Sequence, residues 1–213
     1  MRNLAEIRLS YQRASLDEEG LFPDPMEMFY RWWDDAIDSE ISEPNAMTLA
    51  TVNNLGQPSA RIVLLKEASS EGFEFYTNYN SQKAKDIDAN PKVSVVFLWK
   101  ELERQIRIDG IAEKLSKEKS QLYFQSRPRG SQIGAWASPQ SQIIPDRKFL
   151  DSEADRISDK FENVDPLPVP DHWGGYVINP HTIEFWQGRP DRMHDRFRYL
   201  KNDDAWIIQR LAP

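Results

Sequence analysis

The spacing of apolar residues changes along the chain and separates helical from extended segments. Residues 25–37 place Phe29 and Trp32 at the three- to four-residue interval of an amphipathic helix, and Asp24 followed by Pro25 is a favourable start for one. Farther along, apolar and polar residues alternate, which predicts strands. The predicted strands cover residues 46–52, 59–67, 73–78, 92–99, 104–112, 175–178, 182–186, 196–200 and 205–211.

Three more helices are predicted between these strands, at residues 81–90, 116–126 and 146–162. Residues 129–144 are polar and predicted to be irregular, and a proline-rich joint at 166–170 precedes the last strands. Short strands that follow one another directly, with few helices, are typical of an antiparallel barrel rather than a doubly wound sheet. We therefore predict a mainly β, α+β protein: an antiparallel β-barrel with peripheral helices.

Length and composition limit the possible classes of protein. The 213 residues suffice for one domain with a real core, and we expect that domain to span 24–213 after a polar arm at 1–23. A net charge of -7 argues against non-specific nucleic-acid binding, and no apolar run is long enough to span a membrane. The chain contains no cysteine, which excludes disulfides and thiol chemistry. The first residues lack a signal-peptide pattern, so we expect a cytosolic protein.

The densest group of candidate functional side chains lies at residues 184–198, where four arginines and a histidine surround a tryptophan. Gly188 and Pro190 interrupt this run, so we expect a turn that lets the cationic side chains converge. Grouped arginines bind planar or phosphorylated anions, and histidine titrates near neutral pH. The alternative is a salt-bridged surface loop, because Asp191 and Asp195 alternate with the arginines.

A second cationic group begins at Tyr123. Tyr123 and Arg127 lie four residues apart on one predicted helix face, and Ser131 follows a proline-bent turn. An arginine, a hydroxyl and a phenol arranged in this way suit a clamp for a phosphate monoester.

Other candidate residues stand alone in the sequence. Arg61 and Lys66 fall on opposite faces of one predicted strand, and Lys83 lies near the start of a short helix, where backbone donors favour anions. Each of these is equally well an ordinary surface cation when taken singly. Arg8 and Tyr11 are the notable side chains of the arm, which is either a frayed terminus or a lid over a site.

The sequence lacks the usual motifs of phosphate and nucleophile chemistry. Neither G-x-G-x-x-G nor G-x-x-x-x-G-K-[ST] occurs, and no nucleophile elbow, catalytic triad or glycosidase-like pair of carboxylates is evident. His172, His181 and His194 have no metal-ligand spacing, so no metal site is expected. What remains is an organic cofactor that is held by charged side chains and carries the reaction.

Seven segments form a recognisable set across nearly the whole chain, from about residue 8 to 213. They are RIVLLK at 61–66, FYTNYNSQKA at 75–84, ERQIRIDG at 103–110, YFQSRPRGSQIGAWAS at 123–138, WGGY at 173–176, EFWQGRPDRMHDRF at 184–197 and RLAP at 210–213. These segments resemble the pyridoxamine/pyridoxine 5′-phosphate oxidase family. The resemblance implies an FMN-binding split β-barrel that forms a homodimer. It also implies oxidation of pyridoxamine or pyridoxine 5′-phosphate to pyridoxal 5′-phosphate, with hydride transfer to FMN and reoxidation by O2 to H2O2.

The resemblance also implies roles for single residues, some of them acting across the dimer interface. Cofactor binding falls to Arg61, Ile62, Val63, Leu64, Lys66, Tyr76, Thr77, Gln82, Lys83, Gln105, Gln140, Ser141, Trp186 and Arg196. Substrate binding falls to Lys66, Tyr123, Arg127 and Ser131, with Arg8 and Tyr11 covering the site and Arg192 and His194 as catalytic residues over the pyridine ring. Gln82 departs from the family pattern, in which an arginine precedes the lysine, and we expect weaker FMN binding there.

Two other functions are open at this point. One is a related flavin split-barrel oxidoreductase that acts on another substrate, and the other is a non-catalytic protein that binds flavin or pyridoxal phosphate. The intact set of Lys66, Tyr123, Arg127, Ser131, Arg192 and His194 favours the oxidase over both.

Overall fold

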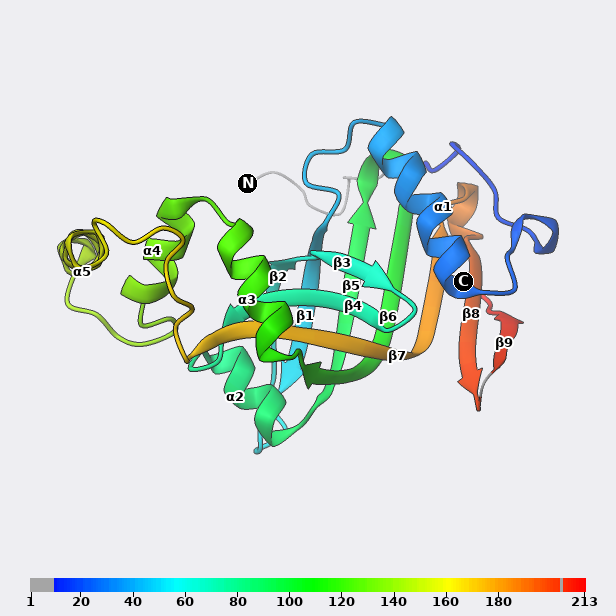
Figure 1. The fold of residues 1–213 in the computed structure, drawn as a ribbon. Helices are drawn as coiled ribbons and strands as arrows, with labels where there is room; N and C mark the ends of the chain where they lie inside the picture. Colours follow the sequence, from blue (N-terminus) through cyan, green and yellow to red (C-terminus); the bar gives the residue numbers. More distant parts are fainter. Residues whose placement is uncertain (1–9, 204) are drawn as a thin grey trace, which may run out of the picture.

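The protein folds as a curled antiparallel sheet with helices at one end and against one face (Figure 1). The computed structural model describes residues 10–203 and 205–213. Its strands are β1 (Ala46–Val52), β2 (Pro58–Leu64), β3 (Glu67–Ser69), β4 (Gly72–Asn78), β5 (Lys92–Trp99), β6 (Arg104–Lys114), β7 (Trp173–Gln187), β8 (Asp195–Asn202) and β9 (Ala205–Arg210). Its helices are α1 (Pro25–Asp38), α2 (Gln82–Ala89), α3 (Lys117–Ser126), α4 (Arg129–Ala137) and α5 (Arg147–Lys160), with short 3-10 turns η2 (Glu18–Gly20), η3 (Lys100–Leu102) and η4 (Pro190–Arg192). Within the described residues, none of the helices is long and apolar enough to cross a membrane.

Strand β7 organises the sheet. The strands follow the order β2-β1-β5-β6-β7-β4-β3, and β8 and β9 continue from β7 as a branch. β7 pairs with β4 through residues 173–178 and with β8 through residues 182–187, while β6 runs along most of its length. The N–H of Lys66 donates to the carbonyl of Glu74 (2.8 Å), which brings the chain after β2 onto β4 and curls the sheet. The predicted antiparallel barrel with peripheral helices is confirmed.

Two hydrophobic cores hold these elements together. The predicted apolar face of α1 is buried in the larger core, where Phe29 packs edge-on to Phe73 with 5.0 Å between ring centroids. Trp32 of the same helix packs edge-on to Phe185 of β7 (5.2 Å). The second core lies between α3, α4 and α5 around the fully buried Phe124. Helix α1 therefore covers the inner face of the sheet, α2 adds Ala84 and Ile87 to the same core, and α3, α4 and α5 form a separate layer at one end.

The other face of the sheet points away from the larger core. Cross-strand register places Ile62, Thr48, Val96, Arg107 and Glu184 in one row on this face, which we call the outer face. The row begins with an apolar side chain in contact with solvent, since Ile62 is 64% exposed. Leu98, which pairs with Gln105 on the same face, is 65% exposed as well, and several exposed apolar side chains on one sheet face are typical of a surface that meets another protein.

The prediction that residues 129–144 are irregular is wrong for their first half, which forms α4. Two glycines weaken helix propensity in this segment, but its apolar side chains pack into the second core, and burial outweighs propensity. Arg129 adds a tether, because its guanidinium donates to the carbonyls of Phe161 and Val164 (2.6 and 2.7 Å) beyond α5.

Two predicted strands, 175–178 and 182–186, are in fact one strand, β7. Pro180 lies between the two predicted segments, and a proline has no N–H to donate to a sheet. In the structure Gly110 pairs with Pro180 and Asp109 with Thr182, so the register shifts at this point and His181 bulges out. A bulge leaves one residue without a ladder partner and accommodates the missing N–H.

The predicted strand 59–67 is likewise divided in the structure. β2 ends at Leu64 and β3 begins at Glu67, and the N–H of Leu65 donates to the carbonyl of Asn45 (2.8 Å). The alternation predicted for RIVLLK is confirmed within β2, because Arg61 pairs with Leu49 on the inner face and Ile62 with Thr48 on the outer face.

The described part of the arm lies against the C-terminal strands and is not frayed. Leu16 is buried in the larger core, and its N–H donates to Asp195 Oδ2 (3.1 Å). Arg13 is bound through its N–H to Glu103 (3.0 Å) and through its guanidinium to the carbonyl of Glu101 (2.9 Å). Arg8 lies outside the described residues.

We predict that Gly72→Ala destabilises the protein more than Gly56→Ala. Both glycines have positive φ (129° and 79°), so alanine at either position adds backbone strain of about 1–3 kcal/mol. At Gly72 a Cβ atom would also lie 2.2 Å from the carbonyl oxygen of Ile178, whereas at Gly56 it would meet nothing within 4 Å. Urea unfolding of both variants isolates the steric contribution, and equal losses would contradict the packing of β4 against β7.

Candidate active site

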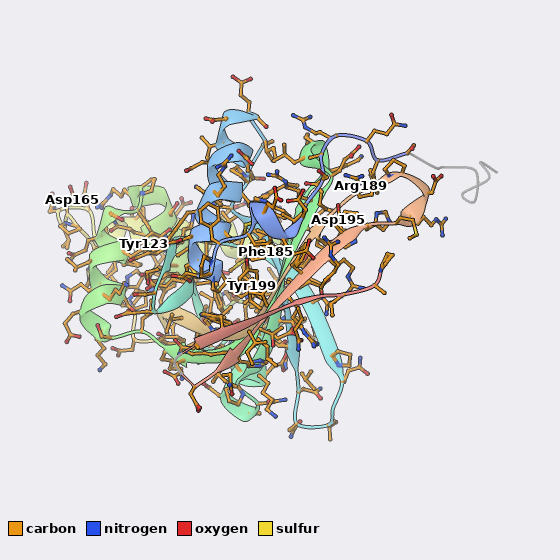
Figure 2. The ribbon with its side chains drawn as sticks, turned by 90° about the vertical axis from the view of Figure 1, so that its right-hand side faces the viewer. Tyr123, Asp165, Phe185, Arg189, Asp195 and Tyr199 are labelled. Atoms are coloured by element: carbon orange, nitrogen blue, oxygen red, sulfur yellow. The ribbon has the colours of Figure 1, made fainter. Side chains whose placement is uncertain are left out.

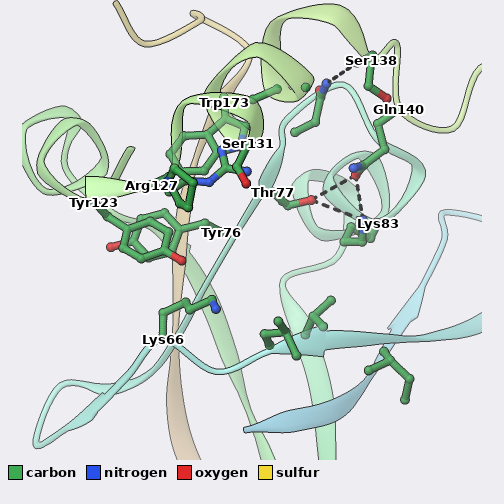
Figure 3. A pocket seen from close by; sticks show the side chains of 17 residues that line it. Lys66, Tyr76, Thr77, Lys83, Tyr123, Arg127, Ser131, Ser138, Gln140 and Trp173 are labelled. Atoms are coloured by element: carbon green, nitrogen blue, oxygen red, sulfur yellow. Dashed lines mark hydrogen bonds between the residues drawn. The ribbon is translucent and has the colours of Figure 1, made fainter. Parts of the chain in front are cut away.

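A pocket of about 630 Å³ opens between β2, β4, the start of α2 and the corner between α3 and α4 (Figure 3). It brings together most of the residues that the sequence predicted for one site. Those that line it are Ile62, Val63, Leu64, Lys66, Tyr76, Thr77, Lys83, Tyr123, Arg127, Ser131 and Gln140. The pocket has a cationic group at each end, and aromatic rings line the end that holds Arg127.

The first cationic end lies at the start of α2. Lys83 Nζ donates to Gln140 Oε1 (2.9 Å) and Thr77 Oγ1 (3.2 Å), and burial together with nearby Arg61 lowers the pKa of the lysine. Ser81, at the cap of α2, is completely buried, and its hydroxyl has no partner among the described residues. A cation, an unpartnered hydroxyl and the free N–H groups of a helix start are what a phosphate monoester requires.

Arg61 is fixed behind this end of the pocket. Its guanidinium donates to the carbonyl of Leu49 (3.1 Å) and to Thr51 Oγ1 (2.8 Å), and it lies 3.9 Å from Asp86. Asp86 is buried and also accepts from Gln82 Nε2 (2.8 Å). The carboxylate therefore orients both the arginine and the glutamine beside the helix start.

Aromatic rings line the pocket on the side of Arg127. Tyr76 of β4 stacks on Tyr123 of α3 with 4.0 Å between ring centroids and on Trp173 of β7 with 5.5 Å. Burial raises the pKa of Tyr76 to about 12, so its phenol stays neutral. Flat apolar surfaces of this kind favour a planar ligand.

The second cationic end is formed by Arg127, Lys66 and Ser131 (Figure 3). The guanidinium of Arg127 lies 4.9 Å from the ring centroid of Trp173, and its NH1 group is buried with no hydrogen-bond partner in the described part of the chain. Burial lowers the pKa of Arg127, but a guanidinium remains cationic at neutral pH. A buried donor that has no acceptor favours an anionic ligand at this point.

A second group of predicted residues lies at the far end of β7. Gln105 pairs with Trp186 across β6 and β7, and Trp186 pairs with Arg196 across β7 and β8. The ring of His194 is 4.5 Å from that of Trp186, and Arg192 lies in the adjoining turn η4. We call these five residues the β7-end group.

Tyr11 of the arm covers the β7-end group. Its ring is 5.8 Å from Trp186 and 5.9 Å from His194, between ring centroids. Gly188 makes this approach possible, because a Cβ atom there would lie 2.8 Å from Tyr11 Cγ. The arm therefore reaches Trp186 and His194 through Tyr11, and a contact of Tyr11 with substrate stays a prediction.

Within one chain, the pocket and the β7-end group do not meet. Trp173 and Trp186 are 13 residues apart on β7, which corresponds to roughly 40 Å of extended strand. Figures 1 and 2 show this separation, with Tyr123 on one side of the molecule and Arg189 and Asp195 on the other.

His194 is held in a defined tautomer. Its Nδ1 accepts from the backbone N–H of Arg189 (3.1 Å), so the hydrogen of the neutral ring lies on Nε2. Burial, Arg192 and Arg196 lower the pKa of His194, and Asp195 opposes them. The ring is therefore a neutral hydrogen-bond donor at physiological pH.

Other predicted residues lie outside the pocket. Gln82 is bonded to Asp86, and Ser141 is an exposed residue with φ of 70°. Arg196 is paired with Glu184 (2.9 Å) and donates to the carbonyl of Ala212 (2.9 Å). Their contacts with a cofactor stay predictions. Among the described residues, no cluster of three or more acidic or histidine side chains is placed to hold a metal ion.

Sequence reasoning assigned no role to Trp173 or Asp86. Trp173 supports both Tyr76 and Arg127, and the motif WGGY after the proline joint marked it without indicating what it touches. Asp86 lies four residues after Gln82 on α2, so their contact follows helical spacing, but its contact with Arg61 depends on tertiary structure.

Comparison with known proteins identifies the relatives of this chain. Residues 33–161 match the family model described as pyridoxamine 5′-phosphate oxidase, and residues 173–213 match the pyridoxine 5′-phosphate oxidase C-terminal dimerisation region. A pyridoxine/pyridoxamine 5′-phosphate oxidase of Salinibacter ruber is 52% identical, with 100% of both chains covered. Pyridoxine/pyridoxamine 5′-phosphate oxidase 2 of Hydrogenovibrio crunogenus is 51% identical, with 99% of both chains covered.

Solved structures agree with these matches. The structure of PhzG from Burkholderia lata in complex with tetrahydrophenazine-1-carboxylic acid has a TM-score of 0.89 at 27% identity, covering 96% of this chain and 100% of that one. An FMN binding protein from Nostoc punctiforme has a TM-score of 0.70 at 17% identity, covering 91% and 100%, which supports the split-barrel fold. The resemblance seen in the sequence is confirmed, and the chain belongs to the pyridoxamine 5′-phosphate oxidase family.

Proposed function

We propose that this protein is an FMN-dependent oxidase that converts pyridoxamine 5′-phosphate or pyridoxine 5′-phosphate to pyridoxal 5′-phosphate. The substrate carbon loses a hydride to FMN, and O2 takes the electrons and is reduced to H2O2. With the amine substrate, water then replaces nitrogen and ammonia leaves. The names of the relatives at 52% and 51% identity support this assignment. A cytosolic location is part of the proposal.

One observation carries the proposal: the pocket has two separate cationic ends, one of which is lined by aromatic rings. Lys83 and the start of α2 form one end, and Arg127 with Lys66 forms the other. A ligand with a single phosphate can place that phosphate at only one of these ends. Two phosphorylated ring compounds, a cofactor and a substrate, satisfy both.

The residues at the α2 end fit the phosphate of FMN. Lys83 and Arg61 supply positive charge, Thr77 and the buried hydroxyl of Ser81 supply hydrogen bonds, and Ile62 lies at the rim for the flavin ring. Bound there, FMN supplies the hydride acceptor and the reaction with oxygen. The protein's own share is to bind and orient the two rings and to exclude water between them.

The residues at the other end fit the phosphate of the substrate. Arg127 is fixed by stacking over Trp173, so its donors are directed before the ligand arrives. Lys66 adds a second charge from the opposite wall, and Ser131 and Tyr123 add hydroxyl groups. These four residues form what we call the phosphate clamp.

We further propose that two copies of the chain complete each site. Gln105, Trp186 and Arg196 share the outer face with Ile62 and Leu64, as the cross-strand register requires. A twofold axis through that face would set the β7-end group of one copy beside the pocket of the other. The match of residues 173–213 to a dimerisation region supports a homodimer.

In this arrangement Arg192 and His194 lie over the substrate ring and act there as catalytic residues. Arg192 supplies positive charge against the ring and its reacting substituent. His194 donates from Nε2 to an oxygen of the ring, because Nδ1 is already bonded to Arg189. Gln140 lies on the cofactor side of the same pocket, where its Oε1 accepts from Lys83.

The function is tested by aerobic assay of both phosphorylated vitamers and their unphosphorylated counterparts. We expect the wild type to form pyridoxal phosphate and to depend strongly on the phosphate. We expect Arg127→Ala to raise KM by roughly tenfold to a hundredfold with a smaller change in kcat, since a charge-assisted bond contributes about 1.5–3 kcal/mol.

Arg129→Ala is the matched control, because Arg129 is bonded to the carbonyls beyond α5 and does not line the pocket. Its KM should equal that of the wild type. A flavin-containing protein that oxidises neither vitamer would point to another flavin split-barrel function. An unchanged KM in Arg127→Ala would remove that residue from the clamp.

A shared site predicts complementation between two defective chains. Arg127→Ala alters the pocket and Arg192→Ala alters the β7-end group, so each homodimer has two damaged sites. A hybrid has one site with both changes and one with neither. Random association of differently tagged, co-expressed chains should therefore restore about a quarter of wild-type activity at low substrate. Absence of any gain in the purified hybrid would show that each site belongs to one chain.

His194 should titrate below its ordinary pKa of 6.5. Because its folded pKa is lowered, the neutral ring stabilises the fold at higher pH, and both this stability and kcat/KM should fall as pH drops through the folded pKa. Arg192→Met removes one repelling charge and should move the pKa upward. NMR titration measures the change, with exposed His181 as internal control. A wild-type His194 that titrates above 6.5 would contradict its role as a neutral donor.

A further inference from the structure

A partly buried ion bridge lies beside the phosphate clamp and does not line the pocket. Glu67 of β3 and Glu74 of β4 are directly opposite each other in the hairpin. Lys119 of α3 reaches between them, with Nζ 2.5 Å from Glu74 Oε1 and 3.3 Å from Glu67 Oε2. Two like charges facing each other across a hairpin repel, so the lysine is needed to hold both in place.

If the bridge only attached α3 to the sheet, burying the charge of Glu74 would cost more free energy than apolar packing at the same place. Glu74 is 0% exposed, and its second oxygen, Oε2, has no partner among the described residues. Burial raises the pKa of Glu74, and its bond to Lys119 opposes that shift. Apolar side chains of similar volume usually hold two elements together at least as firmly as a buried ion pair. What the charged pair adds is a fixed direction and distance.

Two elements, β4 and α3, connect the bridge to residues of the clamp. On β4, Glu74 and Tyr76 share one face because they are two residues apart. On α3, Lys119 and Tyr123 share one face because they are four residues apart. The ion pair and the stacked rings of Tyr76 and Tyr123 are therefore successive contacts between the same strand and the same helix. One turn farther on is Arg127, over Trp173.

The other end of the bridge is tied to Lys66. Glu67 follows Lys66 in the chain, and the N–H of Lys66 donates to the carbonyl of Glu74 (2.8 Å). The remaining anchors of α3 lead elsewhere: Ser120 Oγ accepts from the N–H of Gly175 in β7 (3.2 Å) and Phe124 enters the second core. Lys119 thus joins the helix that carries Tyr123 and Arg127 to the segment that carries Lys66.

We propose that Lys119, Glu74 and Glu67 are positioning residues that set the distance between the two halves of the phosphate clamp. One half is Lys66 on the hairpin side, and the other is Tyr123 with Arg127 on the helix side (Figure 3). The proposal rests on the proposed function, because the clamp is the site of the substrate phosphate. The bridge therefore contributes to the affinity for the substrate and not to the rate of the chemical step.

The test replaces the bridge without leaving a buried charge. In the double variant Lys119→Met/Glu74→Leu the net charge is unchanged and both side chains are apolar, so we expect a melting temperature and FMN affinity close to wild type. We expect KM for pyridoxine 5′-phosphate to rise by roughly threefold to tenfold while kcat stays within about twofold, because the loss is one of uniform binding. Lys119→Arg keeps the bridge and should restore wild-type KM.

Lys117→Met is the control for charge, since Lys117 is an exposed lysine on the same helix. If the double variant folds poorly, Glu67→Gln replaces it, because this carboxylate is half-exposed and its loss leaves no buried charge alone. A stable double variant, or in its place Glu67→Gln, with wild-type KM would overturn the proposal. An equal rise of KM in Lys117→Met would do so as well.

Anaerobic calorimetry with pyridoxine 5′-phosphate and enzyme whose FMN has been reduced beforehand gives the same comparison without reaction, because reduced FMN accepts no hydride. Weaker binding by the double variant than by the wild type supports the positioning role, and equal binding contradicts it. Failure of the wild type to form product would instead contradict the proposed oxidation. The two failures are therefore distinguishable.

Discussion

The length and continuity of β7 constrain the whole molecule. This strand holds β4 along its first half and β8 along its second, and β6 spans the join between them. An extended strand of 15 residues cannot fold back on itself, so Trp173 at its start and Trp186 near its end stay apart. The pocket and the β7-end group can therefore contact the same ligand only if one of them comes from a second copy of the chain. Dimerisation is, on this view, a consequence of sheet geometry.

The side chains at both ends of the pocket are positively charged, although the protein as a whole is negatively charged. The chain carries a net charge of -7, yet the pocket presents Lys83 at one end and Arg127 at the other. Carboxylates lie behind several of the nearby cations, as Asp86 lies behind Arg61 and Glu184 behind Arg196. Lys83 and Arg127 show no such ion pair in the described structure, so the third N–H of Lys83 and the NH1 group of Arg127 remain available for an anion. Acidic residues thus orient part of the site while its binding atoms stay cationic.

The arm and the turn after β7 depend on each other. Asp195 accepts from the N–H of Leu16 and pairs with Arg210 (3.1 Å), which fastens the arm to the last two strands. Gly188 leaves the space that Tyr11 occupies beside His194. Because Leu16 is buried in the larger core, the arm is held by packing as well as by hydrogen bonds. The side chains of the β7-end group are therefore set by contacts that come from both ends of the chain.

Local patterns were enough to predict much of this structure. The apolar face of α1 and the alternation of Arg61 and Ile62 in β2 follow from helical and extended periodicity. The spacing of Tyr123 and Arg127 placed both on one face of α3, and the structure brings both to one pocket. These features were predictable because each depends on residues that are neighbours in the sequence.

Tertiary structure alone decided the remainder. Helix α4 exists because its apolar residues meet the second core, and β7 passes Pro180 because β6 accommodates a bulge there. The bridge from Lys119 to Glu74 joins elements 45 residues apart, and nothing in either segment indicates the other. Each of these contacts gains its free energy from a partner that is distant in sequence, whereas periodicity reports only on residues within a turn or a strand.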